Sequence, residues 1–115
     1  MNQKGIYLKR NKIRQLIRMS NRRPNGLYWG TGETDNHIQM KLEICKYKKK
    51  LRHEFYSEAI LTTGDRADIL CVDCGIIYEV CESETMASLN RKYQEYPLPV
   101  IIVKAGQSFN EKLIM

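Results

Sequence analysis

Two acidic residues stand in apolar segments where a carboxylate is disfavoured. Asp68 lies within RADILC and Glu79 within IIYEVC, and both runs indicate strands, in which acids are uncommon. Carboxylates on neighbouring strands can hold a divalent cation between them, and hard oxygen ligands suit Mg²⁺ or Mn²⁺. Such an ion polarises a phosphate and lowers the pKa of a bound water for attack on phosphorus. The alternative is that both acids are solvent-facing strand residues without a ligand.

The spacing of the two acids predicts that they meet on one face of a β-hairpin. Cys74 and Gly75 are expected to form its two-residue turn. In that register Asp68 lies opposite Cys81, and Glu79 is its diagonal neighbour on the same face. The two carboxylates would then be roughly 7–8 Å apart.

Cys71 and Cys74 form a close pair of the kind that supplies half of a zinc ribbon, since two thiolates two residues apart bind one side of a tetrahedral ion. A second close pair is absent from the sequence. The other candidate ligands are scattered singly: His37, Cys45, His53 and Cys81. A zinc site, an iron–sulfur cluster and plain buried thiols therefore remain as alternatives, and the plain thiols are favoured.

Basic residues are concentrated at the start of the chain. Residues 1–32 hold eight of the 19 lysines and arginines and no acid, whereas the other 83 residues hold 11 basic and 13 acidic side chains. Such a segment is typical of proteins that bind a polyanion, because its cations neutralise phosphates and release counterions. A solvated helix face is the alternative. The side chains predicted to bind a nucleic-acid backbone are Lys9, Arg10, Lys12, Arg14, Arg18, Arg22, Arg23, Lys48 and Lys49.

The elements that must position these residues follow from the hydrophobic periodicity. Of the 115 residues 43% are hydrophobic and 28% charged, which predicts one α/β domain of ordinary composition. Helices are expected over 7–20, 37–51 and 85–96, and strands over 54–62, 67–73, 76–82 and 100–103. No apolar stretch approaches the roughly 20 residues of a membrane span, and no apolar leader is visible. We therefore expect a cytoplasmic protein without a membrane partner.

A loop rich in Asn, Gly, Pro and Thr is expected over residues 21–36. It carries two adjacent aromatic residues, Tyr28 and Trp29. They are either anchors against the body or surfaces on which bases stack. Anchoring is favoured, because a large aromatic side chain gains most by burying its ring.

At this point the chain resembles a known superfamily. The order of helix, three strands, helix and strand, with RADILCVD leading into GIIYEVCES, resembles the restriction-endonuclease-like PD-(D/E)XK fold of archaeal Holliday junction resolvases and many restriction and repair nucleases. The stretch ending in PLPVIIVK is also similar to short archaeal and archaeal-virus proteins assigned there. The resemblance covers about residues 35–105. It implies a nuclease core over 35–115, with a mixed central sheet flanked by helices, behind a basic helix-and-loop arm over 1–34.

The resemblance also implies roles for single residues. Asp68 matches the metal-binding Asp of the second strand, and Glu79 matches the acidic position of the third. Cys81 stands where the superfamily usually has its catalytic lysine. Some members recruit a lysine or glutamine from the following helix, which nominates Lys92 or Arg91 here.

Further acids complete the site that the resemblance implies. A third metal-binding acid often comes from the first helix or strand, which points to Glu43 or Glu58. Glu58 is preferred because it lies within an apolar strand. A second acid near the missing lysine would be Glu82 or Glu84.

These assignments predict a Mg²⁺- or Mn²⁺-dependent DNA endonuclease, in the host cytoplasm if the protein is viral. The alternative is a DNA-binding protein that keeps the nuclease fold and has lost the chemistry, which the replacement by Cys81 favours. Small nucleases of this size often dimerise, so a homodimer through the apolar stripe of the first helix is also open. A zinc- or cluster-stabilised adaptor is the third alternative.

Overall fold

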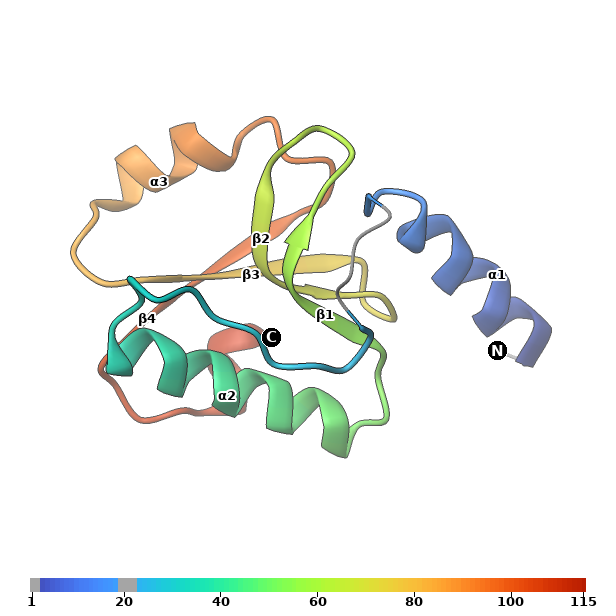
Figure 1. Ribbon diagram of the computed structural model, residues 1–115, viewed down its shortest axis with the longest axis horizontal. Helices are drawn as coiled ribbons and strands as arrows, with labels where there is room; N and C mark the ends of the chain where they lie inside the picture. The colour runs from blue at the N-terminus through green and yellow to red at the C-terminus, as the bar shows by residue number, and fades with distance from the viewer. Residues whose placement is uncertain (1–2, 19–22) are drawn as a thin grey trace.

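The computed structural model describes residues 3–18 and 23–115 of the chain (Figure 1). Its elements in chain order are α1 (Gln3–Arg14), α2 (Asp35–Lys50), β1 (Phe55–Ile60), β2 (Arg66–Cys71), β3 (Ile76–Cys81), α3 (Met86–Tyr93), β4 (Val100–Lys104) and the short 3-10 helix η1 (Glu111–Ile114). The predicted α/β class and the order of helices and strands are confirmed. The structure adds η1, which the sequence reasoning did not include.

The four strands form one mixed sheet in the order β1-β2-β3-β4. The β1–β2 and β2–β3 pairs are antiparallel, whereas β3 and β4 are parallel. A parallel pair needs a crossover connection, and α3 lies within it. The chain therefore turns back through α3 before it adds β4 to the edge of the sheet.

The β2–β3 turn is longer than predicted. Cys71 pairs with Ile76, so four residues, 72–75, form the turn in place of the predicted Cys74 and Gly75 alone. Asp73 leaves the strand because its carboxylate accepts a hydrogen bond from the main-chain N–H at the start of β1, 2.6 Å away. The predicted register is therefore wrong by two residues.

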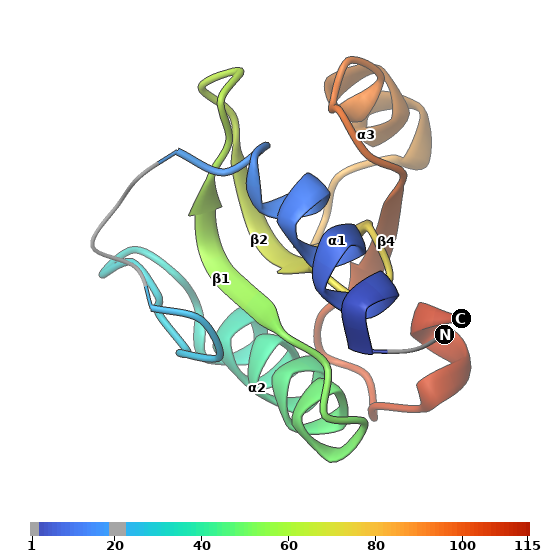
Figure 2. The ribbon, with the colours of Figure 1, turned by 90° about the vertical axis from the view of Figure 1, so that its right-hand side faces the viewer.

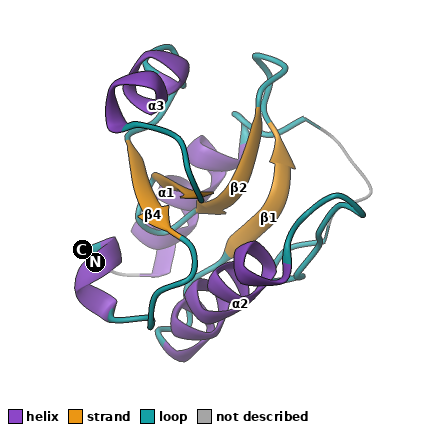
Figure 3. Cartoon of the chain, turned by 90° about the vertical axis from the view of Figure 1, so that its left-hand side faces the viewer, coloured by secondary structure: helices purple, strands orange, loops and turns teal. Residues whose placement is uncertain are grey.

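Helices cover both faces of the sheet (Figures 2 and 3). Helix α2 packs on one face, where Met40 and Ile44 contact a cluster that includes Ile69 from β2. On the opposite face, Ile13 of α1 packs against a second cluster that includes Leu70. The chain after α3 adds the partly buried residues Tyr96, Leu98 and Val100 to that second cluster.

The basic N-terminal helix is docked on the body. Arg14 donates two hydrogen bonds of 2.6 Å to the Glu54 carboxylate, and Arg10 lies 2.9 Å from a carboxylate oxygen of Asp73. The helix ends at Arg14, earlier than predicted, because Ile17 then forms an isolated bridge with Leu61. None of the helices in the described residues is long and apolar enough to cross a membrane.

Candidate functional site

Three carboxylates form a row across the sheet. The pairs on either side in β1 and β2 place Glu58 opposite Asp68, and the β2–β3 register places Asp68 opposite Glu79. Glu58 is 4% exposed and Glu79 is 3% exposed, while Asp68 is half-buried. The longer turn thus makes Asp68 and Glu79 direct neighbours, closer than the predicted diagonal pair.

The backbone is irregular at the level of this row. The N–H of Asp68 donates to Oε2 of Glu79 at 3.2 Å, and the N–H of Val80 donates to Oδ2 of Asp68 at 2.8 Å. Glu58 has a φ of 52°, in the left-handed region that non-glycine residues rarely adopt. Such strain is concentrated at functional sites, where surrounding contacts hold it in place. Here it turns the Glu58 side chain toward α2.

Glu33 completes a group of three acids. Carboxylate oxygens of Glu33, Glu58 and Asp68 all lie within 4.8 Å of one another. Glu33 comes from the loop before α2, whose first turn is capped by the Thr34 hydroxyl. Sequence reasoning missed Glu33, because an acid in a loop shows no periodicity that would mark it.

A buried lysine neutralises part of this group. Lys41 of α2 is 0% exposed, and its Nζ lies 2.8 Å from Oε1 of Glu58 and 3.2 Å from Oε1 of Glu33. The carbonyl of Tyr28 accepts a further bond of 2.8 Å. Arg66 approaches Glu58 from the solvent side at 3.4 Å. A buried charge persists only when it is paired and hydrogen-bonded, and Lys41 and Glu58 meet that requirement together.

His37 lies one turn before Lys41 on α2 and faces the same site. Its Nε2 is 3.0 Å from the carbonyl oxygen of Val80 and 3.4 Å from Oδ2 of Asp68, and its Nδ1 is 3.4 Å from Oε2 of Glu33. The hydrogen bond with Asp68 raises the pKa of His37. His37 and Lys41 are four residues apart on a helix, so they lie on the same side of it. That spacing is the signal in the sequence that could have identified them as a pair.

Glu79 and Asp68 differ sharply in protonation. Burial and then the charge of Asp68 raise the pKa of Glu79 to about 10. Burial also opposes the ionisation of Asp68, but hydrogen bonds with His37, with the Glu79 carboxyl group and with the Val80 N–H outweigh it and lower the pKa of Asp68. Among the described residues, no hydrogen-bond partner reaches the buried Oε1 of Glu79. A cation bound beside Asp68 would satisfy this oxygen after displacing the proton of the Glu79 carboxyl group.

A cleft of about 450 Å³ opens onto this row. Asp68 and Glu79 are among the residues that line it, together with residues of the loop after β3 and of helix α3. Other lining residues are Glu33, His37, Arg66, Glu82, Glu84, Lys92 and Tyr93. The Thr34 hydroxyl donates a hydrogen bond to Glu82, which ties the start of α2 to the loop after β3.

The structure therefore places two of the predicted acids, Asp68 and Glu79, in one cleft with Lys92 on its wall, while Glu58 lies beside Asp68 in a group with Glu33 and does not line the cleft. Glu43 is elsewhere: it lies on α2 within 3.0 Å of Nε2 of Gln39.

The basic residues named from the sequence fall into three groups. Arg10 and Arg14 are paired with carboxylates of the body. Lys48 is 3% exposed, so it cannot present its charge to a phosphate. The exposed members among the described residues are Lys9, Lys12, Arg18, Arg23 and Lys49. Arg22 lies outside the described residues.

Trp29 is 56% exposed, so the expectation that it anchors the loop is wrong. Its neighbour Tyr28 is held through the main chain, because its N–H donates to the Ser57 hydroxyl at 2.7 Å and its carbonyl accepts from Lys41. The Trp29 side chain is thus exposed beside a stretch of main chain that Ser57 and Lys41 hold in place.

Comparison of the chain with family models, with curated proteins and with solved structures gave no match. The site is therefore interpreted from its own residues.

Proposed function

We propose that the protein is a Mg²⁺- or Mn²⁺-dependent phosphodiesterase that cleaves DNA at the cleft over Asp68 and Glu79. The observation that carries the proposal is the buried Oε1 of Glu79, which lacks a partner among the described residues and lies beside an ionised Asp68. The restriction-endonuclease-like topology suggested by the sequence is part of the same proposal, since the element order and the row of acids are those that it requires.

The donors present fit a hard divalent cation. Asp68 and its neighbour Glu79 would hold it, because Mg²⁺ and Mn²⁺ prefer carboxylates. Glu33 or Glu58, whose carboxylate oxygens lie within 4.8 Å of one of Asp68, would be a further oxygen donor. When bound, the ion supplies a Lewis acid for the phosphate and a water of lowered pKa.

The surrounding residues position this set. His37 contacts the Asp68 carboxylate through Nε2, and Lys41 of α2 holds the Glu58 carboxylate by a hydrogen bond of 2.8 Å. Lys92 lines the cleft wall and offers a cation to the negative charge that develops on a phosphate. It would thus serve in place of the lysine that Cys81 replaces.

DNA would bind through the exposed cations and through Trp29. Lys9 and Lys12 on α1 are free to contact phosphates, whereas the exposed indole can stack on a base. Stacking needs an unpaired base, so single-stranded or branched DNA is the preferred substrate of this proposal.

A second candidate is a DNA-binding protein of the same fold without cleavage. One observation favours it: Lys41 already neutralises Glu58 and Glu33, which lowers the negative charge available to a cation. The two candidates differ in metal binding at Asp68 and Glu79, which the enzyme requires.

Cleavage of labelled single-stranded, duplex and branched DNA with Mg²⁺ or Mn²⁺ tests the proposal. We expect cutting that is lost in Asp68→Asn and Glu79→Gln and kept in Glu43→Gln, a matched acid outside the cleft. Cutting that survives both site variants would refute the assignment. Tight, salt-sensitive binding without any cutting would favour the second candidate.

A further inference from the structure

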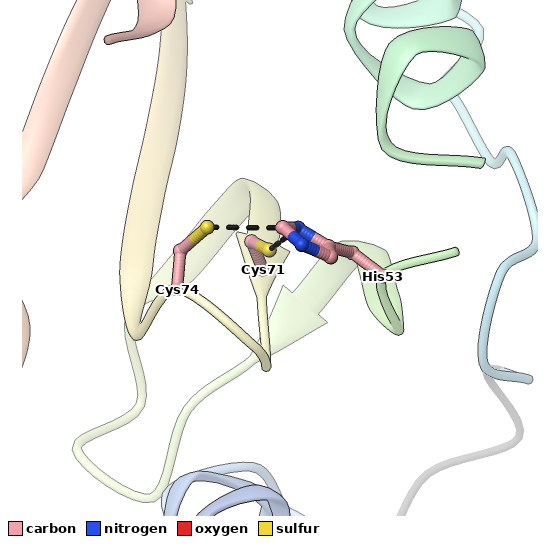
Figure 4. A group of neighbouring side chains, drawn as sticks. All are labelled: His53, Cys71 and Cys74. Atoms are coloured by element: carbon pink, nitrogen blue, oxygen red, sulfur yellow. Dashed lines mark hydrogen bonds between the residues drawn. The ribbon is translucent and has the colours of Figure 1, made fainter. Parts of the chain in front are cut away.

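A second group of potential metal ligands lies at the other end of β2 (Figure 4). His53 belongs to the connection between α2 and β1, Cys71 ends β2, and Cys74 lies in the turn before β3. The ligand atoms of the three side chains lie within 4.8 Å of one another. The group is separate from the acidic row, since Asp68 and Cys71 are three residues apart on an extended strand, roughly 10 Å.

The two nitrogen–sulfur distances in this group match those of a tetrahedral site. Nδ1 of His53 is 3.6 Å from Sγ of Cys71 and 3.6 Å from Sγ of Cys74. With Zn–S near 2.3 Å and Zn–N near 2.05 Å, a tetrahedral zinc ion separates sulfur from nitrogen by about 3.6 Å. The side chains therefore already stand at the ligand separations that zinc requires.

A buried lysine contacts one of the sulfurs. Lys48 is 3% exposed, and its Nζ lies 3.3 Å from Sγ of Cys74 and 4.8 Å from the ring centroid of Tyr78. No carboxylate forms an ion pair with Lys48 within the part of the chain that the structure describes. Lys48 therefore donates a hydrogen bond to the Cys74 sulfur. Burial raises the pKa of Cys71 to about 11, so that thiol keeps its proton until a metal ion displaces it. Hydrogen bonds from neighbouring groups to the ligands are also a regular feature of metal sites.

We propose that His53, Cys71 and Cys74 bind one Zn²⁺ ion, with the fourth position open to solvent. His53 and Cys74 are half-buried, which leaves a path for the ion. Binding displaces the protons of the two thiols to solvent, and no oxidant is needed. The ion would link the α2–β1 connection to the β2–β3 turn. Asp73 of the same turn forms an ion pair with Arg10, so the ion would also stabilise the position of α1.

Metal analysis and Co²⁺ titration of the full chain, prepared without oxygen, test this site. We expect one zinc per chain and a sulfur-to-cobalt charge-transfer band on titration with Co²⁺. Cys74→Ser and His53→Gln should weaken Co²⁺ binding at least about 100-fold. Cys81→Ser, a buried cysteine of β3 outside the group, should leave it unchanged. The acidic row cannot produce the band, because it has no thiolate; Asp68→Asn should therefore leave the band intact.

A second measurement covers the case in which a ligand variant fails to fold. In the wild-type chain, zinc should slow alkylation of Cys71 and Cys74, mapped by mass spectrometry, and should leave the rate at Cys81 unaltered. Absence of a charge-transfer band, or equal alkylation with and without zinc, would overturn the proposal. So would a chain that holds a Cys71–Cys74 disulfide and takes up no metal after reduction.

Discussion

The main-chain N–H of Asp68 donates a hydrogen bond to the side-chain carboxylate of Glu79, 3.2 Å away, at a point where two antiparallel strands normally join through main-chain groups alone. This hydrogen bond engages only Oε2 of Glu79. The other oxygen, Oε1, is buried and has no hydrogen-bond partner among the described residues. Asp68 keeps its charge through His37, whereas Glu79 does not ionise readily. The pair therefore holds one stable anion and one carboxyl group whose ionisation costs stability.

Glu79→Gln should stabilise the protein at neutral pH. The pKa of Glu79 rises from an ordinary value near 4.5 to about 10 on folding, so the folded state favours the protonated form. Such a group makes its full contribution to the free energy of unfolding below pH 4.5, and that contribution is lost as the pH rises toward 10. Glutamine does not ionise, so the substitution should raise the free energy of unfolding by up to about 3 kcal/mol at pH 7 and by almost nothing near pH 4.

Urea unfolding of the wild type and of Glu79→Gln at several pH values measures this gain. Glu43→Gln is the control, because that carboxylate is partly exposed and lies outside the cleft. An equal gain at pH 4 and pH 8 would show that Glu79 ionises normally in the folded state.

Mn²⁺ should stabilise the wild-type chain and should not stabilise Asp68→Asn. A ligand that binds only the folded state adds about 2.7 kcal/mol at a concentration 100 times its Kd. Thermal unfolding with increasing Mn²⁺ measures the effect as a rise of several degrees in Tm. The same rise in Asp68→Asn would place the ion elsewhere on the protein.

The sequence was sufficient for the part of the site that depends on strand neighbours. Asp68 and Glu79 stand out because each interrupts an apolar strand, and Glu58 stands out for the same reason in β1. The register differs from the predicted one by two residues, and a shift of two keeps both side chains on the same face of the sheet. Alternation along neighbouring strands is a local pattern, and local patterns are visible in a single sequence.

The rest of the site depends on tertiary contacts that no local pattern encodes. The four-residue turn before β3 forms because Asp73 bonds to the start of β1 and to Arg10, which lies 63 residues away in the chain. Glu33 reaches Asp68 only because α2 packs across the sheet. The length of the β2–β3 turn and the position of the loop that carries Glu33 could therefore not be predicted from the sequence.

Lys41→Met should destabilise the protein strongly, and a second change should relieve part of the loss. Removing the ammonium leaves the buried Glu58 carboxylate without its main partner, which costs about 3–5 kcal/mol. Adding Glu58→Gln removes the uncompensated charge, so the double variant should be more stable than Lys41→Met alone. Chemical denaturation of the two single variants and the double variant gives the coupling between the residues. Additive losses would mean that the two side chains do not interact.

Lys9 and Lys12 should contribute to DNA binding more than Arg10 and Arg14, although all four lie on the same helix. The arginines are paired with carboxylates of the body, whereas both lysines are exposed. Each phosphate contact adds about 0.7 to the salt slope for single strands, so the double variant Lys9→Gln/Lys12→Gln should lower that slope by about 1.4. Arg14→Gln should instead loosen α1 and lower the stability, because it breaks the two bonds to Glu54. Titration of single-stranded DNA against the fluorescence of the single tryptophan, Trp29, at several salt concentrations provides the slopes. An unchanged slope in the double lysine variant would exclude α1 from the binding surface.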